Sequence, residues 1–183
     1  MIGVLALQGG FAAHARMLRA LGAQAREVRV PGDLEGLDGL IIPGGESTTM
    51  TLGIRREGLA EPLRALAAAG TPILGTCAGL IMLDREHLAI MDICAQRNAF
   101  GRQVRSFEAD LQVAGLDGPS LRAVFIRAPW IAEHGEDVEI LASVDGHAIA
   151  ARQANLLAVA FHPELGQDTR LHERLLALSA RSP

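Results

Sequence analysis

Short apolar runs alternate with amphipathic stretches through the first half of the chain. The runs are continuous and end in glycine or proline turns, which is typical of buried parallel strands. Two stretches between them carry apolar residues at helical spacing, and Gly22 stands where a helix C-cap is expected. The pattern predicts strands over Ile2–Leu7, Ala25–Val30, Leu37–Pro43 and Pro72–Gly75, and helices over Phe11–Leu21 and Leu59–Ala69.

The middle of the chain changes character and then returns to the first pattern. Short strand-like runs at Phe107–Val113, Leu121–Ile126 and Val138–Val144 are separated by turns, which indicates an antiparallel extension. Leu156–Phe161 again has the pattern of a buried strand, and Arg170–Ala180 that of an amphipathic helix.

The order of elements predicts one domain over residues 1–183, of the α/β class. We expect a doubly wound, mostly parallel, flavodoxin-like sheet with helices on both faces and a small antiparallel extension. A chain of 183 residues can bury a sizeable core by itself.

Composition narrows the classes of partner. The net charge is −4 and no basic tail is present, so nucleic acid is not expected as a partner. No apolar run approaches membrane length, and the apolar start lacks the positive region of a signal peptide. With only Cys77 and Cys94, a disulfide framework is not expected, and the predicted location is cytoplasmic. All 17 basic residues are arginine, so this chain cannot form a lysine Schiff base.

The sharpest local signal is Gly75-Thr76-Cys77-Ala78-Gly79, which follows a predicted strand and precedes an apolar helix start. This is the form of a nucleophile elbow with cysteine in place of serine. Small flanking residues suit a strained turn, and the N-terminus of the next helix favours negative charge on the sulfur and offers the Ala78 N–H to an oxyanion. The competing interpretation is a buried structural cysteine, which is the one we favour for Cys94.

A thiolate nucleophile needs a base and a group that orients the base. His162-Pro163-Glu164 supplies both at the end of a predicted strand. We expect Pro163 to keep the chain extended, so that His162 and Glu164 project to the same side. A lone His-x-Glu motif is weak evidence and gains weight only beside the cysteine elbow. Metal binding by these residues is not expected, since the spacing is not that of a zinc site.

Adjacent glycines follow the third predicted strand, in Pro43-Gly44-Gly45-Glu46-Ser47-Thr48-Thr49. Their N–H groups can turn toward an anion, and Ser47 or Thr48 is expected to cap the helix that follows. A plain β-turn with an N-cap would explain the same residues. The location favours a site, because doubly wound sheets bind ligands at the carboxyl ends of their strands.

These motifs resemble a known family, the class I (triad) glutamine amidotransferases, and within it the glutaminase subunit of the two-component pyridoxal 5′-phosphate synthase. The class is indicated by Gly75–Leu80 and Phe161–Leu165. The subfamily is indicated by blocks spread over nearly the whole chain, at Leu7–Gly9, Pro43–Met50, Arg97–Gln103, Ser106–Leu111 and Phe125–Pro129.

The resemblance implies a catalytic triad in which Cys77 is the nucleophile, His162 the base and Glu164 its orienting group. It implies that the substrate L-glutamine contacts six residues: Gly45, Glu46, Ser47, Arg97, Ile126 and Arg127. The oxyanion would be held by the amides of Gly45 and Ala78. The residues themselves do not decide which arginine binds the substrate carboxylate.

The resemblance also implies no cofactor and no metal, and a partner: a lysine-bearing (β/α)8 synthase subunit in a large hetero-oligomeric complex, which receives the ammonia. We expect that this partner activates the glutaminase by ordering the Gln8–Gly10 and Gly44–Gly45 turns. His14 is expected either to contact the partner or merely to cap a polar helix face.

One departure from the family pattern lies between Cys77 and His87, where the sequence is shorter than is typical. Met82–Glu86 is either a trimmed loop or a place where residues are missing from the sequence. Other functions also stay open at this point: a stand-alone cysteine hydrolase or peptidase acting on γ-glutamyl compounds, a glutaminase subunit of another biosynthetic complex, and a non-catalytic binding module.

Overall fold

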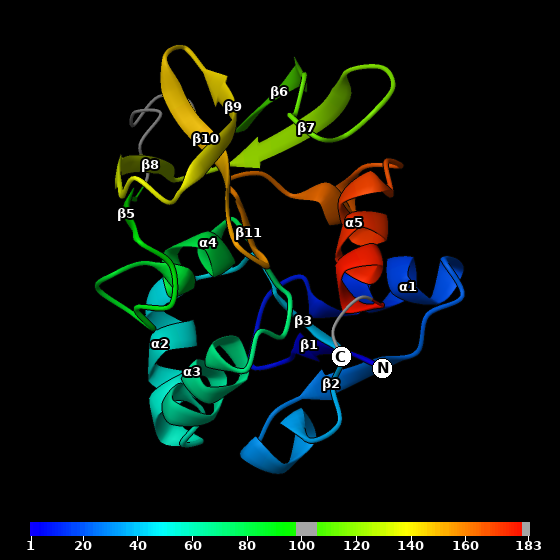
Figure 1. Ribbon diagram of the computed structural model, residues 1–183, viewed down its shortest axis with the longest axis vertical. Coiled ribbons are helices and arrows are strands. Elements are labelled where there is room, and N and C mark those ends of the chain that lie inside the picture. The colour runs from blue at the N-terminus through cyan, green and yellow to red at the C-terminus, as the bar shows by residue number, and fades with distance from the viewer. Residues whose placement is uncertain (98–105, 181–183) are drawn as a thin grey trace.

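The structure is a computed structural model that describes residues 1–97 and 106–180. A nine-stranded sheet forms its centre, and a separate pair of strands lies at one end (Figure 1). The helices are α1 (Phe11–Ala20), α2 (Ser47–Arg56), α3 (Ala60–Ala68), α4 (Ala78–Leu83) and α5 (Arg170–Ser179), with short 3-10 helices η1 (Pro31–Leu34) and η2 (Pro163–Leu165).

The parallel part of the sheet confirms the predicted α/β fold. Its strands run in the order β2-β1-β3-β4-β11, and every neighbouring pair among them is parallel. Their bounds are β1 (Ile2–Leu5), β2 (Ala25–Val28), β3 (Gly39–Ile42), β4 (Ile73–Thr76) and β11 (Leu156–Val159). All four residues are buried in each of β1, β3, β4 and β11, which explains their continuous apolar sequences.

The sheet continues beyond β11 through antiparallel strands in the order β10-β8-β5, and β9 also pairs with β10. These strands are β5 (Ile93–Gln96), β8 (Trp130–His134), β9 (Glu139–Val144) and β10 (His147–Gln153). The separate antiparallel pair is β6 (Ser106–Leu111) and β7 (Leu121–Ile126). The predicted extension is therefore present, and it includes β5, β8 and β10, which the sequence pattern did not indicate.

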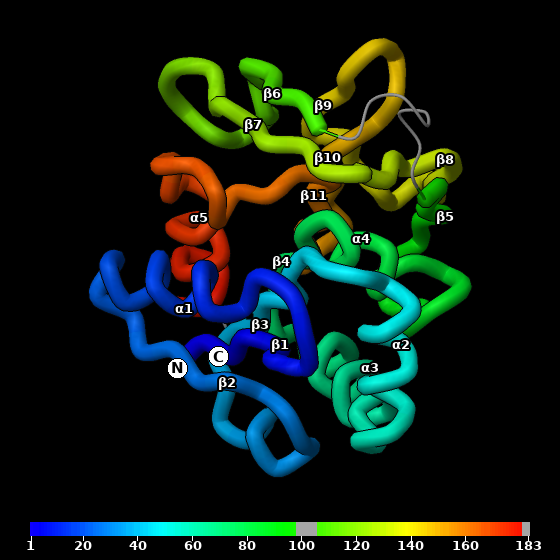
Figure 2. Tube along the Cα trace, turned by 180° about the vertical axis from the view of Figure 1, so that it is seen from behind, coloured from blue at the N-terminus to red at the C-terminus, as the bar shows by residue number. Residues whose placement is uncertain are grey.

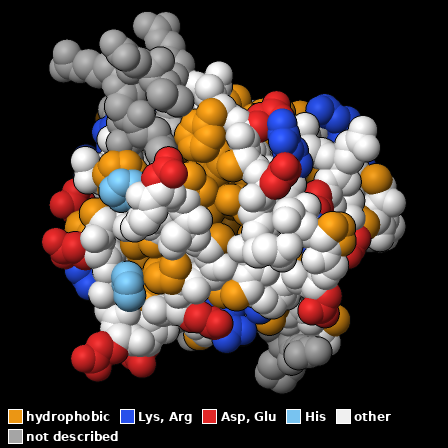
Figure 3. Space-filling view, turned by 90° about the horizontal axis from the view of Figure 1, so that it is seen from above, with side chains coloured by type: hydrophobic (Ala, Val, Ile, Leu, Met, Phe, Trp, Pro, Cys, Tyr) orange, Lys and Arg blue, Asp and Glu red, His pale blue; other side chains and the backbone are white. Residues whose placement is uncertain are grey.

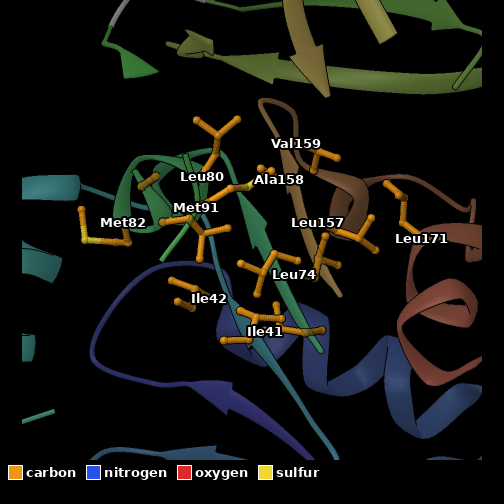
Figure 4. Close-up of a cluster of buried hydrophobic side chains, with 14 of the residues drawn as sticks. Ile41, Ile42, Leu74, Leu80, Met82, Met91, Leu157, Ala158, Val159 and Leu171 are labelled. Carbon is orange, nitrogen blue, oxygen red and sulfur yellow. The ribbon is translucent and has the colours of Figure 1, made fainter. Parts of the chain in front are cut away.

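Helices cover both faces of the sheet, as expected. Helices α1 and α5 lie on one face and α2, α3 and α4 on the other, which Figures 1 and 2 show from opposite sides. The core between them is aliphatic, and Figure 4 shows Ile41, Leu74 and Leu157 from neighbouring strands packed together. No helix in the described part of the chain is long and apolar enough to cross a membrane.

The segment after α4 closes on itself around Asp84, whose side chain is almost completely buried. Asp84 Oδ1 accepts hydrogen bonds from the backbone N–H groups of Glu86 and His87, at 2.9 and 3.1 Å. The chain thus joins α4 to β5 through a compact turn with its polar groups paired.

Close backbone packing surrounds the turn from β4 to α4. A methyl group at Gly79 would overlap the carbonyl oxygen of Ile42, and one at Gly75 would lie 2.7 Å from the carbonyl oxygen of Gly79. The two glycines that flank Cys77 are therefore required for β3, β4 and α4 to approach one another, as the elbow motif predicts.

We predict that Gly79→Ala destabilises the fold. The added methyl group meets backbone rather than a movable side chain, so the free energy of unfolding should fall by about 2 kcal/mol or more. Gly32→Ala is the matched control, because nothing lies within 4 Å of the position its methyl group would take, and it should leave stability unchanged or slightly raised. Urea unfolding measures both variants. Equal stability of the two would contradict the close approach of α4 to β3.

Candidate active site

Cys77 sits at the carboxyl end of β4, on the turn into α4. Its backbone has φ 50° and ψ −107°, a conformation that L-residues rarely adopt. The strained turn expected for a nucleophile elbow is therefore present. The thiol is largely buried and lies 3.8 Å from the carbonyl oxygen of Ile126, to which the S–H donates.

His162 and Glu164 approach Cys77 from the end of β11, the strand that pairs in parallel with β4. The Nδ1 atom of His162 lies 2.7 Å from Oε1 of Glu164, and the glutamate side chain is almost completely buried. The sequence correctly predicts that these side chains meet, but the expected extended course of the chain through Pro163 is wrong. Pro163 begins the 3-10 helix η2 instead of continuing an extended chain, and this turn brings the carboxylate back toward the ring.

The electrostatics of this pair favour an imidazolium beside a carboxylate. Burial disfavours charge on His162, but hydrogen bonds to Cys77 and Glu164, together with their charges, raise the pKa of His162 to about 10. Burial also opposes ionisation of Glu164, but the neighbouring His14 and the hydrogen bond from His162 lower its pKa to about 2. Glu164 is therefore the fixed negative charge against which His162 is held.

The glycine loop after β3 lies against this group and is held in place by Gln8. The side-chain Oε1 of Gln8 accepts from the N–H of Glu46 at 3.0 Å, and its Nε2 donates to the carbonyl oxygen of Glu46 at 3.1 Å. The N–H of Gly10 donates to the carbonyl oxygen of Gly44 at 3.0 Å. A side chain at Gly44 would overlap the His162 ring, so the loop packs directly on the base.

The expected cap of α2 is corrected by the structure. Glu46, rather than Ser47 or Thr48, is the N-cap: its carboxylate accepts from the backbone N–H groups of Thr48 at 3.0 Å and Thr49 at 2.7 Å. Hydrogen bonds from Thr49 and Thr48 lower the pKa of this exposed carboxyl to about 2. A charged carboxylate satisfies two free amides and also suits the positive end of the helix.

A cavity of about 200 Å³ opens beside Cys77. It contains every residue that the resemblance assigns to substrate, nucleophile, base or oxyanion contact, with Ile81 and Pro129 in addition. The lining residues are Gly45, Glu46, Ser47, Cys77, Ala78, Ile81, Arg97, Ile126, Arg127, Pro129 and His162. The sequence also held a pattern that could have indicated each of these two additional residues. Ile81 lies one helical turn after Cys77, and Pro129 closes the Phe125–Pro129 block.

The two arginines of the cavity differ in their surroundings. Arg97 Nη2 lies 3.6 Å from Oε1 of Glu46 and donates to Oγ1 of Thr48 at 3.3 Å. Arg127 has no ion-pair partner among the described residues, and its backbone has a positive φ of 44°. The rest of the Arg97–Gln103 block, residues 98–103, lies outside the described residues.

The location of His14 differs from both expectations for this residue. It neither faces a partner nor caps a polar face, because the residue is fully buried beneath the triad. Its Nε2 atom lies 3.2 Å from Oε2 of Glu164 and 3.2 Å from Oγ1 of Thr76. Over residues 1–97 and 106–180, no group of three or more His, Cys, Asp or Glu side chains is arranged to hold a metal ion.

Comparison with known proteins places this geometry in a family. The model of the SNO glutamine amidotransferase family matches residues 4–178. The chain belongs to this family. This chain is similar to two relatives that are named pyridoxal 5′-phosphate synthase subunit PdxT. One, from Parafrankia sp., is 52% identical over 99% of this chain and 93% of its own length. The other, from Dehalococcoides mccartyi, is 53% identical over 97% of this chain and 96% of its own.

Solved structures agree with the family assignment. A crystal structure of a glutamine amidotransferase superposes on this SNO family chain with a TM-score of 0.91, at 45% identity, over 98% of both chains. The structure of PurLQS from Thermotoga maritima has a TM-score of 0.72 at 15% identity, over 98% of this chain, and shows the fold alone.

The pairing of His162 with Glu164 predicts a titration. The imidazole should titrate near pH 10, and in Glu164→Gln its pKa should fall by about 1 unit or more, because the carboxylate no longer stabilises the imidazolium. NMR of ¹⁵N-labelled histidine measures this. Cys94→Ala is the control, since Cys94 is not among the groups that set the charge of the ring. An unshifted pKa in Glu164→Gln would contradict the assigned pair.

Proposed function

We propose that this chain is a glutaminase that hydrolyses L-glutamine to glutamate and ammonia, and that it serves a pyridoxal 5′-phosphate synthase. The observation that carries the proposal is the convergence of Cys77, His162 and Glu164 at one cavity, on a nucleophile elbow, in a chain of the SNO glutamine amidotransferase family. The names of the full-length relatives support the assignment to pyridoxal phosphate biosynthesis and weigh against a stand-alone hydrolase.

The chemistry is acyl transfer through a thioester. The Cys77 thiolate attacks the side-chain amide carbon of glutamine, and the C–N bond then breaks as His162 gives its proton to the departing ammonia. Water, deprotonated by His162, attacks the γ-glutamyl thioester and releases glutamate and the thiolate. Glu164 holds the Nδ1 side of the ring throughout, so that the other nitrogen serves Cys77 and the reacting groups.

Negative charge develops on the γ-carbonyl oxygen of the substrate in both tetrahedral intermediates, first that of the amide and then that of the thioester. Ala78, in the first turn of α4, and Gly45, in the loop held by Gln8, line the cavity next to Cys77, and their amides are the proposed donors to this oxygen. Amides in the first turn of a helix have no acceptor within the helix, so they are available to an oxyanion. Each donor of this kind contributes about 3 kcal/mol to transition-state stabilisation.

The substrate ends are proposed to bind charged groups of the cavity. Arg127 is the better anchor for the α-carboxylate, because Arg97 is already in contact with Glu46 and Thr48. A guanidinium can grip a carboxylate with two parallel hydrogen bonds. The Glu46 carboxylate, ionised and exposed at the cavity, suits the α-ammonium group. Ser47 and Ile126 complete the proposed contacts with glutamine.

The ammonia is proposed to pass to a separate subunit. The sequence has no lysine, so imine chemistry with a carbonyl substrate requires another chain, and we propose a lysine-bearing (β/α)8 synthase subunit in a large cytoplasmic hetero-oligomer. Exposed apolar side chains near the triad support a docking role: Leu165 follows Glu164 directly, and Ile126 lines the cavity. Seen from above, hydrophobic side chains gather in the middle of the molecular face (Figure 3).

We expect Cys77→Ala to lower glutaminase activity by at least about 1000-fold, with or without the synthase subunit, because no other group can form the thioester. Cys94→Ala is the matched control and should keep normal activity, since its thiol lies on β5 outside the cavity. Ammonia release from glutamine is the measurement. Activity that survives Cys77→Ala would refute the proposed function.

Replacing Arg127 tests the substrate anchor. Arg127→Met should raise KM for glutamine by about 10- to 100-fold, because charge-assisted hydrogen bonds to the carboxylate contribute about 1.5–3 kcal/mol to binding. The value of kcat should change little. Arg122→Met is the control. Arg122 lies on β7, the strand just before Arg127, and pairs with Glu108 and Asp110, so its replacement should leave KM and kcat unchanged. A KM that rises for Arg97→Met but not for Arg127→Met would reverse the assignment.

A further inference from the structure

A buried polar cluster extends the triad into the interior of the protein. His14 from α1, His172 from α5 and Thr76 at the end of β4 are all fully buried, and Glu164 is nearly so. Figures 1 and 2 both show α1 and α5 side by side on one face of the sheet. Polar groups buried this deeply cost stability unless they are paired, so the cluster calls for a role.

The contacts run in a line from the triad inward. Glu164 uses Oε1 for His162, at 2.7 Å, and its Oε2 lies 3.2 Å from Nε2 of His14. The same Nε2 lies 3.2 Å from Oγ1 of Thr76, the residue before the nucleophile. On the opposite side of the ring, Nδ1 of His14 lies 2.8 Å from Nε2 of His172, with the two rings tilted by 39°.

The chemistry of these contacts selects one arrangement of protons. An N–H at Nε2 of His14 faces the Glu164 carboxylate, whereas a lone pair there would repel it. With its N–H at Nε2, His14 offers Nδ1 as an acceptor, so His172 donates to it from Nε2. This leaves Nδ1 of His172 as an unprotonated nitrogen, and that atom is buried without a hydrogen-bond partner among the described residues. An unpaired N–H donor at the same place would cost more.

The state of His172 agrees with this arrangement. Burial, with the neighbouring His14 acting in the same direction, lowers the pKa of His172 to about 4, so the ring is neutral at neutral pH. A neutral ring with its proton on Nε2 is the donor that His14 needs. His172 therefore fixes the orientation of His14, and His14 presents a fixed N–H to the carboxylate.

The Nε2 atom of His14 lies at the same distance, 3.2 Å, from two oxygens. Its hydrogen bond is directed to Thr76, while Oε2 of Glu164 is in contact but has no aligned hydrogen-bond partner in the described structure. His14 thus touches both arms of the triad, the strand that carries the nucleophile and the carboxylate that orients the base. A methyl group at Gly10 would lie 2.8 Å from Oε1 of Glu164, so the start of α1 also packs on this carboxylate.

We propose that His14 is a positioning residue of the active site: held by His172, it fixes the Glu164 carboxylate against His162 and ties it to the strand that carries Cys77. The inference rests on the proposed function and adds to it a fourth residue, behind the triad. Rotation of the carboxylate away from His162 would misplace the base, and small misplacements of catalytic groups lower rates strongly.

The test is a double-mutant cycle measured as glutaminase activity of the complex with the synthase subunit. His14→Leu should lower kcat by about 10- to 100-fold and change KM little. In a Glu164→Gln background the same substitution should have almost no further effect, because His14 acts through the carboxylate. His14→Gln, which can place an N–H near the position of Nε2, should restore most of the activity. His134→Leu, at the exposed end of strand β8, is the histidine control.

Two outcomes overturn the inference. One is an equal loss from His14→Leu in both backgrounds, which is the mark of a merely structural role. The other is a folded His14→Gln variant as impaired as His14→Leu. If His14→Leu does not fold, His172→Phe takes its place in the test, because this substitution removes the donor to His14 and keeps a ring of similar size. The loss of kcat that His172→Phe causes should also be absent in the Glu164→Gln background. A wild-type complex without glutaminase activity would instead refute the proposed function itself.

Discussion

The backbone turns sharply at Cys77, and the nucleophile, the base and the glycine loop are all arranged around this turn. A residue other than glycine at φ 50° and ψ −107° costs about 1–3 kcal/mol, and the cost is met only where the surroundings hold the turn in place. Here Gly75 and Gly79 let β3, β4 and α4 approach within backbone contact. The turn places Cys77 at the cavity, which Ala78, the first residue of α4, also lines.

The second requirement is a buried negative charge that stays ionised. Glu164 lies almost out of contact with solvent, and burial alone would favour its protonated form. Its two oxygens face two histidines from different elements, His162 after β11 and His14 in α1. The base is thereby oriented by a carboxylate that is itself held from behind. The first helix, far from Cys77 in sequence, becomes part of the structural support of the site.

The sequence was sufficient for the features that rest on local patterns. Continuous apolar runs marked β1, β3, β4 and β11, because strands buried on both faces carry no alternation. The motifs around Cys77 and His162 identified the cavity, since parallel strands bring their carboxyl ends to one edge. The structure places all the predicted contact residues on that cavity.

Features set by tertiary contacts were not predictable in the same way. Strands β5, β8 and β10 are held by antiparallel pairing and have mixed burial, so their sequences resemble loops. The cap of α2 was assigned to the commoner Ser and Thr, although Glu46 can serve both the helix and the cavity. The burial of His14 could have been predicted from the sequence, because His14 shares a helix face with Leu18, one turn later. Its partner His172 lies on another helix, which no local pattern reveals.

The proposed glutaminase reaction requires that Cys77 forms a covalent intermediate with the γ-carbonyl group of glutamine. The most direct measurement is labelling with a glutamine-analogue electrophile, followed by mass spectrometry of the peptides. We expect one adduct, on Cys77, that excess L-glutamine prevents, and no adduct on Cys94. Labelling that spares Cys77, or that glutamine does not prevent, would contradict it.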